Sequence, residues 1–129
     1  IGDYALDAND SATMQVVLAN GALGTVSATR FASGHLNDLR LRLYGEAGGL
    51  EVGFERGVST LRACLEADLP TGTWSDVALD PVPTIYERFV AAIRGEGPAE
   101  PDFARGAMLQ RLLDRAEESA AQGARSLAV

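Results

Sequence analysis

The first part of the chain alternates apolar and polar residues with the period of two that is typical of β-strands. Between Ser11 and Leu79, short apolar and β-branched runs are separated by turn residues about every eight to twelve positions, which indicates antiparallel strands. Leucines at every second position from Leu39 to Leu43 place one apolar face on the third run. The predicted strands cover residues 11–19, 22–32, 38–44, 50–55, 58–65 and 74–79.

Turn residues separate these runs. Asn20-Gly21 readily adopts the positive φ angles of a tight hairpin turn, so we expect the second strand to fold back on the first. Gly45, Gly48 and Gly49 mark the turn between the third and fourth strands. Their spacing, and their place between strands rather than at the start of a helix, favour turn glycines over a phosphate-binding loop.

The pattern changes at Asp80, where Pro81 and Pro83 indicate a linker into helix because proline cannot donate to a sheet ladder. Thr84 is the expected N-cap of a first helix that ends near Gly95. Asp102 is the expected N-cap of a second helix, with Gly123 as its stop and residues 125–129 as a final short strand. The predicted buried stripes are Ile85, Phe89, Val90 and Ile93 in the first helix and Phe103, Leu109, Leu112, Leu113, Ala116 and Ala120 in the second.

Strands followed by two amphipathic helices predict an α+β fold. We expect an open, mainly antiparallel sheet of about six strands, covered on one face by two C-terminal helices, in one domain over residues 1–129. The first two strands carry residues on both sides that are small, apolar or hydroxylated: Met14, Val16, Thr25, Val26, Ser27, Ala28 and Thr29. Because large exposed apolar patches are disfavoured on monomers, this pattern favours an interface on the second face, with an ordinary solvated face as the alternative.

Composition excludes several classes of function. The net charge is −7, every positive charge is an arginine and the chain has no lysine, so Schiff-base chemistry is excluded within it and nucleic-acid binding is disfavoured. No run is long enough to span a bilayer and the start lacks a signal-peptide pattern, so we expect a cytoplasmic protein. Cys64, the single cysteine, is expected to be a small buried hydrophobe, and the single histidine makes a metal site improbable.

The candidate binding residues lie in the connection from Arg30 to Asp38. Arg30 and His35 can donate to sugar or carboxylate oxygens, Asn37 can donate and accept, and Gly34 lets the backbone approach a ligand. The alternative is a polar inter-strand loop with a hydrogen-bonding Asn37. No serine elbow or cysteine–histidine pair indicates nucleophilic catalysis, so no catalytic residue is predicted in this chain.

The order of these segments resembles the C-terminal domain of the Gfo/Idh/MocA oxidoreductase family. The similar segments at the start are Asn20-Gly21-Ala22-Leu23-Gly24-Thr25-Val26, Arg30-Phe31-Ala32-Ser33-Gly34 and Leu39 to Gly45. Those at the end are Pro101-Asp102-Phe103, Gln110-Arg111-Leu112-Leu113-Asp114, Ser119 and Gly123. Together they cover roughly residues 8–129, and their order and spacing carry the resemblance rather than any single motif.

The resemblance implies a complete protein with an N-terminal Rossmann domain, absent from this chain, that binds NAD or NADP. It also implies a small-molecule substrate such as a sugar, polyol or related alcohol, and pairing of subunits through the open sheet face. The family's catalytic lysine, in a Glu-Lys-Pro segment, has no match in this lysine-free chain. Its Asp and His pair has none either, because His35 falls in a later loop; that loop can reach the substrate pocket in the family, which favours Arg30, His35 and Asn37 as substrate contacts.

Three functional interpretations remain at this stage. The first is the substrate-side and assembly part of an NAD(P)-dependent dehydrogenase, inactive alone and binding no cofactor itself. The second is a free-standing, non-catalytic binding or scaffolding domain of the same fold. The third is an unrelated α+β ligand-binding domain.

Overall fold

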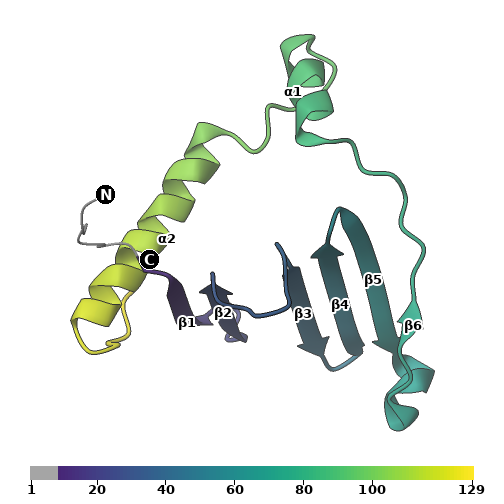
Figure 1. The fold of residues 1–129 in the computed structure, drawn as a ribbon, viewed down its shortest axis with the longest axis horizontal. Helices are drawn as coiled ribbons and strands as arrows, with labels where there is room; N and C mark the ends of the chain where they lie inside the picture. Colours follow the sequence, from purple (N-terminus) through teal and green to yellow (C-terminus); the bar gives the residue numbers. More distant parts are fainter. Residues whose placement is uncertain (1–8) are drawn as a thin grey trace. The chain divides into compact units, whose positions relative to one another are not determined.

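The computed structural model describes residues 9–129. The chain divides into two compact units, and the boundary between them along the sequence lies between Asp80 and Pro81. The first unit contains all the strands and the second contains both α-helices (Figure 1). The α+β class is thus confirmed. Cover of a sheet face by the helices stays a prediction, as does a single domain. Neither helix combines the length and hydropathy that a membrane span requires within the described part of the chain.

The first sheet is a two-stranded antiparallel hairpin of β1 (Ser11–Val17) and β2 (Leu23–Thr29). Gly21 has a φ of 87°, and the backbone N–H of Ala22 donates to the side-chain oxygen of Asn20 at 3.1 Å. The Asn20-Gly21 hairpin is therefore confirmed, with the positive φ angle of its turn at Gly21, where glycine tolerates it.

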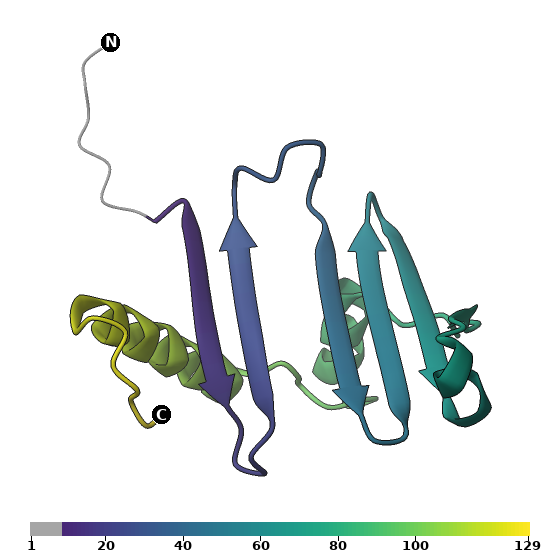
Figure 2. The same cartoon turned by 90° about the horizontal axis from the view of Figure 1, so that it is seen from below.

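The second sheet contains four antiparallel strands in sequence order, and Figure 2 shows the arrows of β3, β4 and β5 alternating in direction. The six predicted strands are confirmed, but their backbone pairing forms two sheets, because β2 and β3 share no ladder. The bounds in the second sheet are β3 (Leu39–Gly45), β4 (Gly48–Glu55), β5 (Val58–Leu65) and β6 (Ser75–Asp76), with a 3-10 helix, η1 (Glu66–Thr71), before β6.

The two faces of the second sheet differ sharply in polarity. Leu41 is opposite Val52 and Leu43 is opposite Leu50, so one face is apolar. On the other face, Arg42, Glu51, Arg62 and Asp76 are neighbours in register across β3, β4, β5 and β6. The two-sided apolar pattern noted for the first two strands therefore does not extend to this sheet.

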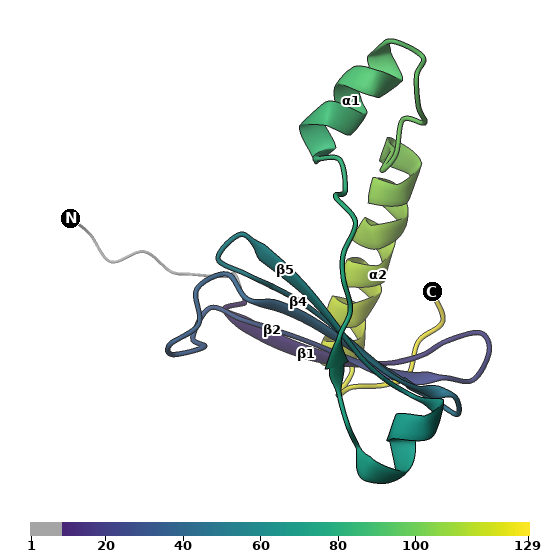
Figure 3. The ribbon, with the colours of Figure 1, turned by 90° about the vertical axis from the view of Figure 1, so that its right-hand side faces the viewer.

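The two helices begin at the predicted caps (Figure 3). Helix α1 (Ile85–Ile93) has a capping box: the Thr84 hydroxyl accepts from the Glu87 backbone N–H, and the Glu87 carboxylate accepts from the Thr84 N–H. Helix α2 (Phe103–Ala121) begins at Asp102, whose side chain accepts from the Arg105 N–H at 2.8 Å. Both caps are confirmed.

The predicted closing strand at residues 125–129 is wrong. The backbone N–H of Ala124 donates to the Ser119 carbonyl at 2.8 Å, and the Ser119 hydroxyl donates to the Arg125 carbonyl at 2.6 Å. These bonds turn the chain back onto the last turn of α2, beyond Gly123 with its φ of 71°. No strand is assigned to residues 125–129.

Burial is concentrated on β5. Within residues 9–129, Ala63 and Cys64 are the buried hydrophobic residues, and the Cys64 thiol donates to the Asp68 carbonyl at 3.6 Å. The expectation of a buried Cys64 is confirmed. No residue of the stripes predicted to be buried on the helices is buried: Phe103 is 99% exposed and Phe89 is exposed, whereas Leu112 and Ala116 are partly exposed. Both segments are helical, as the period of these stripes predicts, but periodicity alone does not specify what covers them.

Candidate functional site

The predicted binding loop follows β2 and leads into β3. Its backbone uses positive φ at Gly34 (84°) and Asn37 (56°), and the His35 N–H donates to the Ala32 carbonyl at 3.0 Å. Asparagine tolerates the left-handed region better than most residues. Asn37 is therefore explained by the conformation of the loop, and its proposed contact with a substrate remains untested.

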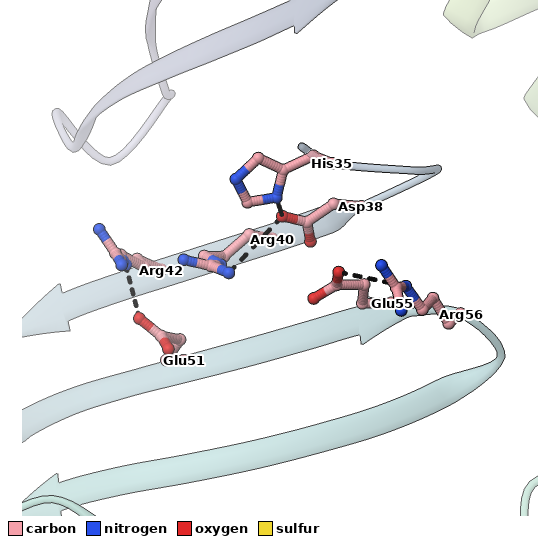
Figure 4. A network of polar contacts seen from close by, with 7 residues as sticks. All are labelled: His35, Asp38, Arg40, Arg42, Glu51, Glu55 and Arg56. Carbon is pink, nitrogen blue, oxygen red and sulfur yellow. Dashed lines mark hydrogen bonds and ion pairs between the residues drawn. The ribbon is translucent and has the colours of Figure 1, made fainter. Parts of the chain in front are cut away.

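His35 is joined to the start of β3 through Asp38. The His35 Nδ1 lies 3.1 Å from a carboxylate oxygen of Asp38, and the same oxygen lies 3.5 Å from the Arg40 guanidinium. Figure 4 shows both side chains directed at this carboxylate. The Asp38 side chain is only 16% exposed, whereas those of His35 and Arg40 are about half exposed. Asp38 therefore holds a cationic and an imidazole group at one edge of the sheet.

In this arrangement Nδ1 of His35 faces the Asp38 carboxylate, and Nε2 lies on the other side of the ring. A carboxylate beside Nδ1 favours the tautomer that carries its proton there, since the bond at one ring nitrogen sets the state of the other. The Nε2 atom of neutral His35 is then an acceptor and can bind a hydroxyl group. In protonated His35 both nitrogens are donors.

Arg30 does not join this group. Its guanidinium lies 3.6 Å from the Asp10 carboxylate, and its backbone N–H donates to the Asp10 carbonyl at 3.0 Å, which ties the end of β2 to the residue before β1. The structure thus brings His35 together with Asp38 and Arg40, but it pairs Arg30 elsewhere.

The charged face of β3–β5 extends the site beyond the predicted residues. Arg42 Nε donates to Glu51 at 2.6 Å, and this hydrogen bond holds the pKa of the Glu51 carboxyl below its ordinary value and raises the pKa of Arg42. Arg56 lies 3.9 Å from Glu55 at the β4–β5 turn (Figure 4). An open depression of about 430 Å³ adjoins these groups; its polar lining residues are Asp38, Arg40, Glu51, Glu55, Arg56 and Thr60.

Sequence reasoning missed this second group of residues, although a signal was present. The glycine turn from Gly45 to Gly48 fixes the register in which Arg42 meets Glu51. Counting residue pairs outward from Gly45 and Gly48 places Arg42 opposite Glu51. The Asp38 contact had no such signal, because it depends on the positive φ at Asn37.

The glycines singled out earlier serve the hairpin. Gly45 ends β3, while Gly48 and Gly49 begin β4, so none of them opens a helix. Among the described residues, no three His, Cys, Asp or Glu side chains are grouped closely enough to hold a metal ion.

The comparison with family models decides the relationship. Residues 3–129 match the family described as oxidoreductase family, C-terminal alpha/beta domain, of the Gfo/Idh/MocA group. The chain belongs to this family. No curated protein and no solved structure matched the chain. The resemblance stated from the sequence is confirmed over residues 3–129, almost the entire chain, and a C-terminal domain implies an N-terminal domain in the same protein.

Proposed function

We propose that this Gfo/Idh/MocA C-terminal domain forms the substrate-side and assembly part of an NAD(P)-dependent oxidoreductase that acts on a sugar, polyol or related alcohol. The main support is the His35–Asp38 pair, in which Asp38 both holds the imidazole and lines an open depression together with Arg40 and Glu51. Hydroxyl groups both donate and accept, and the imidazole, carboxylates and guanidiniums at this edge offer both kinds of partner.

The proposed work of this chain is binding and orientation. His35 contacts a substrate hydroxyl through Nε2, Asp38 holds the imidazole, and Asn37 contributes a further contact from the same loop. Arg30 contributes a contact only when its guanidinium leaves the Asp10 carboxylate. A nicotinamide cofactor supplies the hydride chemistry when it is bound, and we assign that cofactor to an N-terminal Rossmann domain. The described glycine turn lies between strands and does not fit a dinucleotide loop, so no cofactor contact is proposed for this chain. We also propose a cytoplasmic enzyme whose subunits pair through the open sheet face.

The test is kinetic and uses the enzyme that carries this domain together with its Rossmann domain. His35→Ala should lower kcat/KM for the alcohol substrate by about tenfold or more, because a hydrogen bond to a bound polar group is lost. The KM for the nicotinamide cofactor should stay the same. Initial rates of nicotinamide reduction over a panel of sugars and polyols measure both values.

Two further variants sharpen the result. Leu36→Ala changes an exposed neighbour in the same loop and should leave the kinetics unchanged. Asp38→Asn keeps the shape but weakens the control over the His35 tautomer, so it should lower kcat/KM by less than His35→Ala does. Unaltered kinetics in His35→Ala would remove the support for this site.

A further inference from the structure

The turn between β1 and β2 contains an asparagine followed by a glycine, and both residues are open to solvent. Asn20 and Gly21 are exposed, and a Cβ atom built at Gly21 would meet no atom within 4 Å. The Leu18 N–H closes the turn by donating to the Ala22 carbonyl at 2.8 Å. The Asn20 side chain and the backbone after it are therefore within reach of water, with room for a new covalent ring beside Gly21.

Asn20 differs from the other two asparagines of the chain in the residue that follows it. Asn9 and Asn37 each precede an aspartate, whereas Asn20 precedes a glycine. A side chain on the following residue hinders the approach of its backbone nitrogen to the asparagine amide, and glycine has none. Glycine also allows the widest range of backbone angles for that approach. Attack by the next backbone nitrogen is thus easiest at Asn20.

The turn also stabilises the charge that such an attack develops. The Ala22 N–H donates to Asn20 Oδ1 at 3.1 Å. When a nucleophile adds to Cγ, negative charge forms on Oδ1, where this N–H donor is already in place. One bond opposes the reaction, because the Gly21 N–H donates to the Leu18 carbonyl at 2.8 Å and must leave it before the nitrogen can attack. Breaking this exposed bond is a local opening that leaves the ladder between β1 and β2 paired.

We propose that Asn20 is a site of spontaneous deamidation in the folded chain. The Gly21 nitrogen gives its proton to hydroxide or a buffer base and forms a bond to Asn20 Cγ. The Cγ–Nδ2 bond then breaks, and the amide nitrogen takes up a proton from solvent and leaves as ammonia. Water adds to one of the two carbonyls of the resulting cyclic imide and reopens it, which gives aspartate or isoaspartate. The net reaction consumes one water and releases one ammonia, and nothing is oxidised or reduced.

The isoaspartate product changes the backbone of the turn. Its main chain runs through the former side-chain carbon, which adds one methylene to the backbone at position 20. The bond between Leu18 and Ala22, and the pairing of Val17 with Leu23 beside it, depend on the length of this turn. Either product also adds one negative charge to a chain that carries −7. Deamidation thus loosens the end of the hairpin and makes the chain more acidic.

The first experiment incubates the folded chain in mildly alkaline buffer made with water enriched in heavy oxygen. Mass spectrometry of its proteolytic peptides should show, at position 20, a hydroxyl in place of the amino group, with heavy oxygen incorporated. The rate should rise with hydroxide concentration, because the Gly21 nitrogen must lose its proton. Peptides that contain Asn9 or Asn37 are internal controls and should keep their amides.

Asn20→Gln is the matched variant for this experiment. It keeps an amide at position 20, but its longer side chain would have to close a larger ring, so the modification should be lost. Isoaspartyl methyltransferase with a labelled methyl donor provides a second measurement, since it labels isoaspartate and not aspartate. The incubated original chain should take up label, and the Asn20→Gln variant should not.

The second experiment isolates the isoaspartate form by chromatography and follows hydrogen exchange of the Leu18 amide. Exchange should be faster than in the unmodified chain, because the bond from Leu18 to Ala22 is weakened. Asn20→Asp carries the same added charge on an ordinary backbone and is the matched control. Its Leu18 amide should exchange as slowly as that of the original chain.

Three results would overturn the inference. The first is an Asn20 that stays intact in the folded chain while a synthetic peptide of residues 16–25 deamidates under the same conditions, which would show that the turn protects the amide. The second is conversion of Asn37 as fast as that of Asn20, which would show that Gly21 plays no part. The third is equal exchange of the Leu18 amide in the isoaspartate form and the original chain, which would remove the effect on the hairpin.

Discussion

Gly48, the first residue of β4, shows how a single backbone position constrains the second sheet. Its φ is 144°, and a Cβ atom built there would collide with the Cys64 carbonyl oxygen of the neighbouring strand. Gly57, in the β4–β5 turn, also has a positive φ of 82°, but a Cβ atom there would meet open space. Comparing substitutions at the two glycines thus distinguishes the cost of a positive φ angle from the cost of a steric clash.

We predict that Gly48→Ala destabilises the chain much more than Gly57→Ala. The Gly57 variant incurs only the conformational cost of a side chain at positive φ, about 1 kcal/mol. The Gly48 variant adds a clash with backbone that cannot move without breaking the β4–β5 ladder. Urea unfolding followed by circular dichroism measures both, and equal free energies of unfolding would contradict the argument.

At the residue scale, the sequence predicted local chemistry better than contacts. Asn20-Gly21, Thr84 and Asp102 act through bonds to residues two or three positions away, so their roles follow from local sequence. His35 and Asn37 lie in the inter-strand loop that the sequence predicts, yet the sequence does not indicate the Asp38 carboxylate as the partner of His35. That contact requires the left-handed backbone at Asn37, which local polarity does not reveal.

At the scale of elements, α1 depends on its capping box. The Thr84 backbone N–H and then the Thr84 hydroxyl bind the Glu87 carboxylate, and these hydrogen bonds lower the pKa of Glu87. A carboxyl with a lowered folded pKa stabilises the fold above its unfolded pKa, near 4.3, and loses this effect as pH falls through the folded value. The box therefore contributes fully at neutral pH and weakens in acid.

We predict that α1 loses helical order below about pH 4, as protonated Glu87 no longer accepts from the Thr84 N–H. Glu87→Gln should remove this acid dependence. Glu117→Gln, an exposed change on α2, should leave it in place. Amide chemical shifts of residues 85–93 during a pH titration follow the effect, and identical titrations for all three proteins would refute it.

Thr84→Ala provides a test of the same box at neutral pH. Loss of an N-cap hydroxyl costs about 1 kcal/mol of helix stability, and here the Glu87 backbone N–H would be left without its partner. Thr84→Ser keeps the hydroxyl and should retain most of the stability. Amide exchange in the first turn of α1 should accelerate in the alanine variant only.

Element boundaries followed the sequence closely where hydrogen bonding is local or the turn is tight. The predicted strand at residues 58–65 matches β5, and both helices begin where expected. The strand expected at 74–79 shortens to Ser75–Asp76, with η1 ahead of it, and the closing strand is missing. Strand pairing is a property of two segments, so a single apolar run does not determine whether it finds a partner.

At the scale of the whole molecule, the family match and the arrangement of glycines lead to a prediction about cofactor. The chain matches a C-terminal domain family over residues 3–129, and its described glycine turn connects antiparallel strands. We therefore expect no measurable NADH binding by the isolated chain, followed by nicotinamide fluorescence. The same chain fused to its Rossmann domain should bind NADH. Micromolar affinity of the isolated chain for NADH would contradict the assignment of the cofactor to the Rossmann domain.

The overall class of fold was readable from the sequence because periodicity reports strands, helices and their order. The division of six strands into two sheets was not readable, since the connection from β2 to β3 gives no sign that the ladder stops there. The exposed stripes on α1 and α2 make the same point: an apolar stripe predicts that a surface is to be covered without naming the cover.

The alternating charges across β3–β6 also bear on folding fidelity. The four charged residues, Arg42, Glu51, Arg62 and Asp76, come from four different strands, and successive side chains of a strand point to opposite faces of the sheet. Misalignment of β4 by a single position would place Glu51 on the face of the leucines and Leu50 or Val52 on the charged face. The four alternating charges thus disfavour shifted strand pairings while the sheet forms. Replacing them with uncharged residues should yield more misregistered, aggregation-prone chains, even where the correctly folded form keeps its stability.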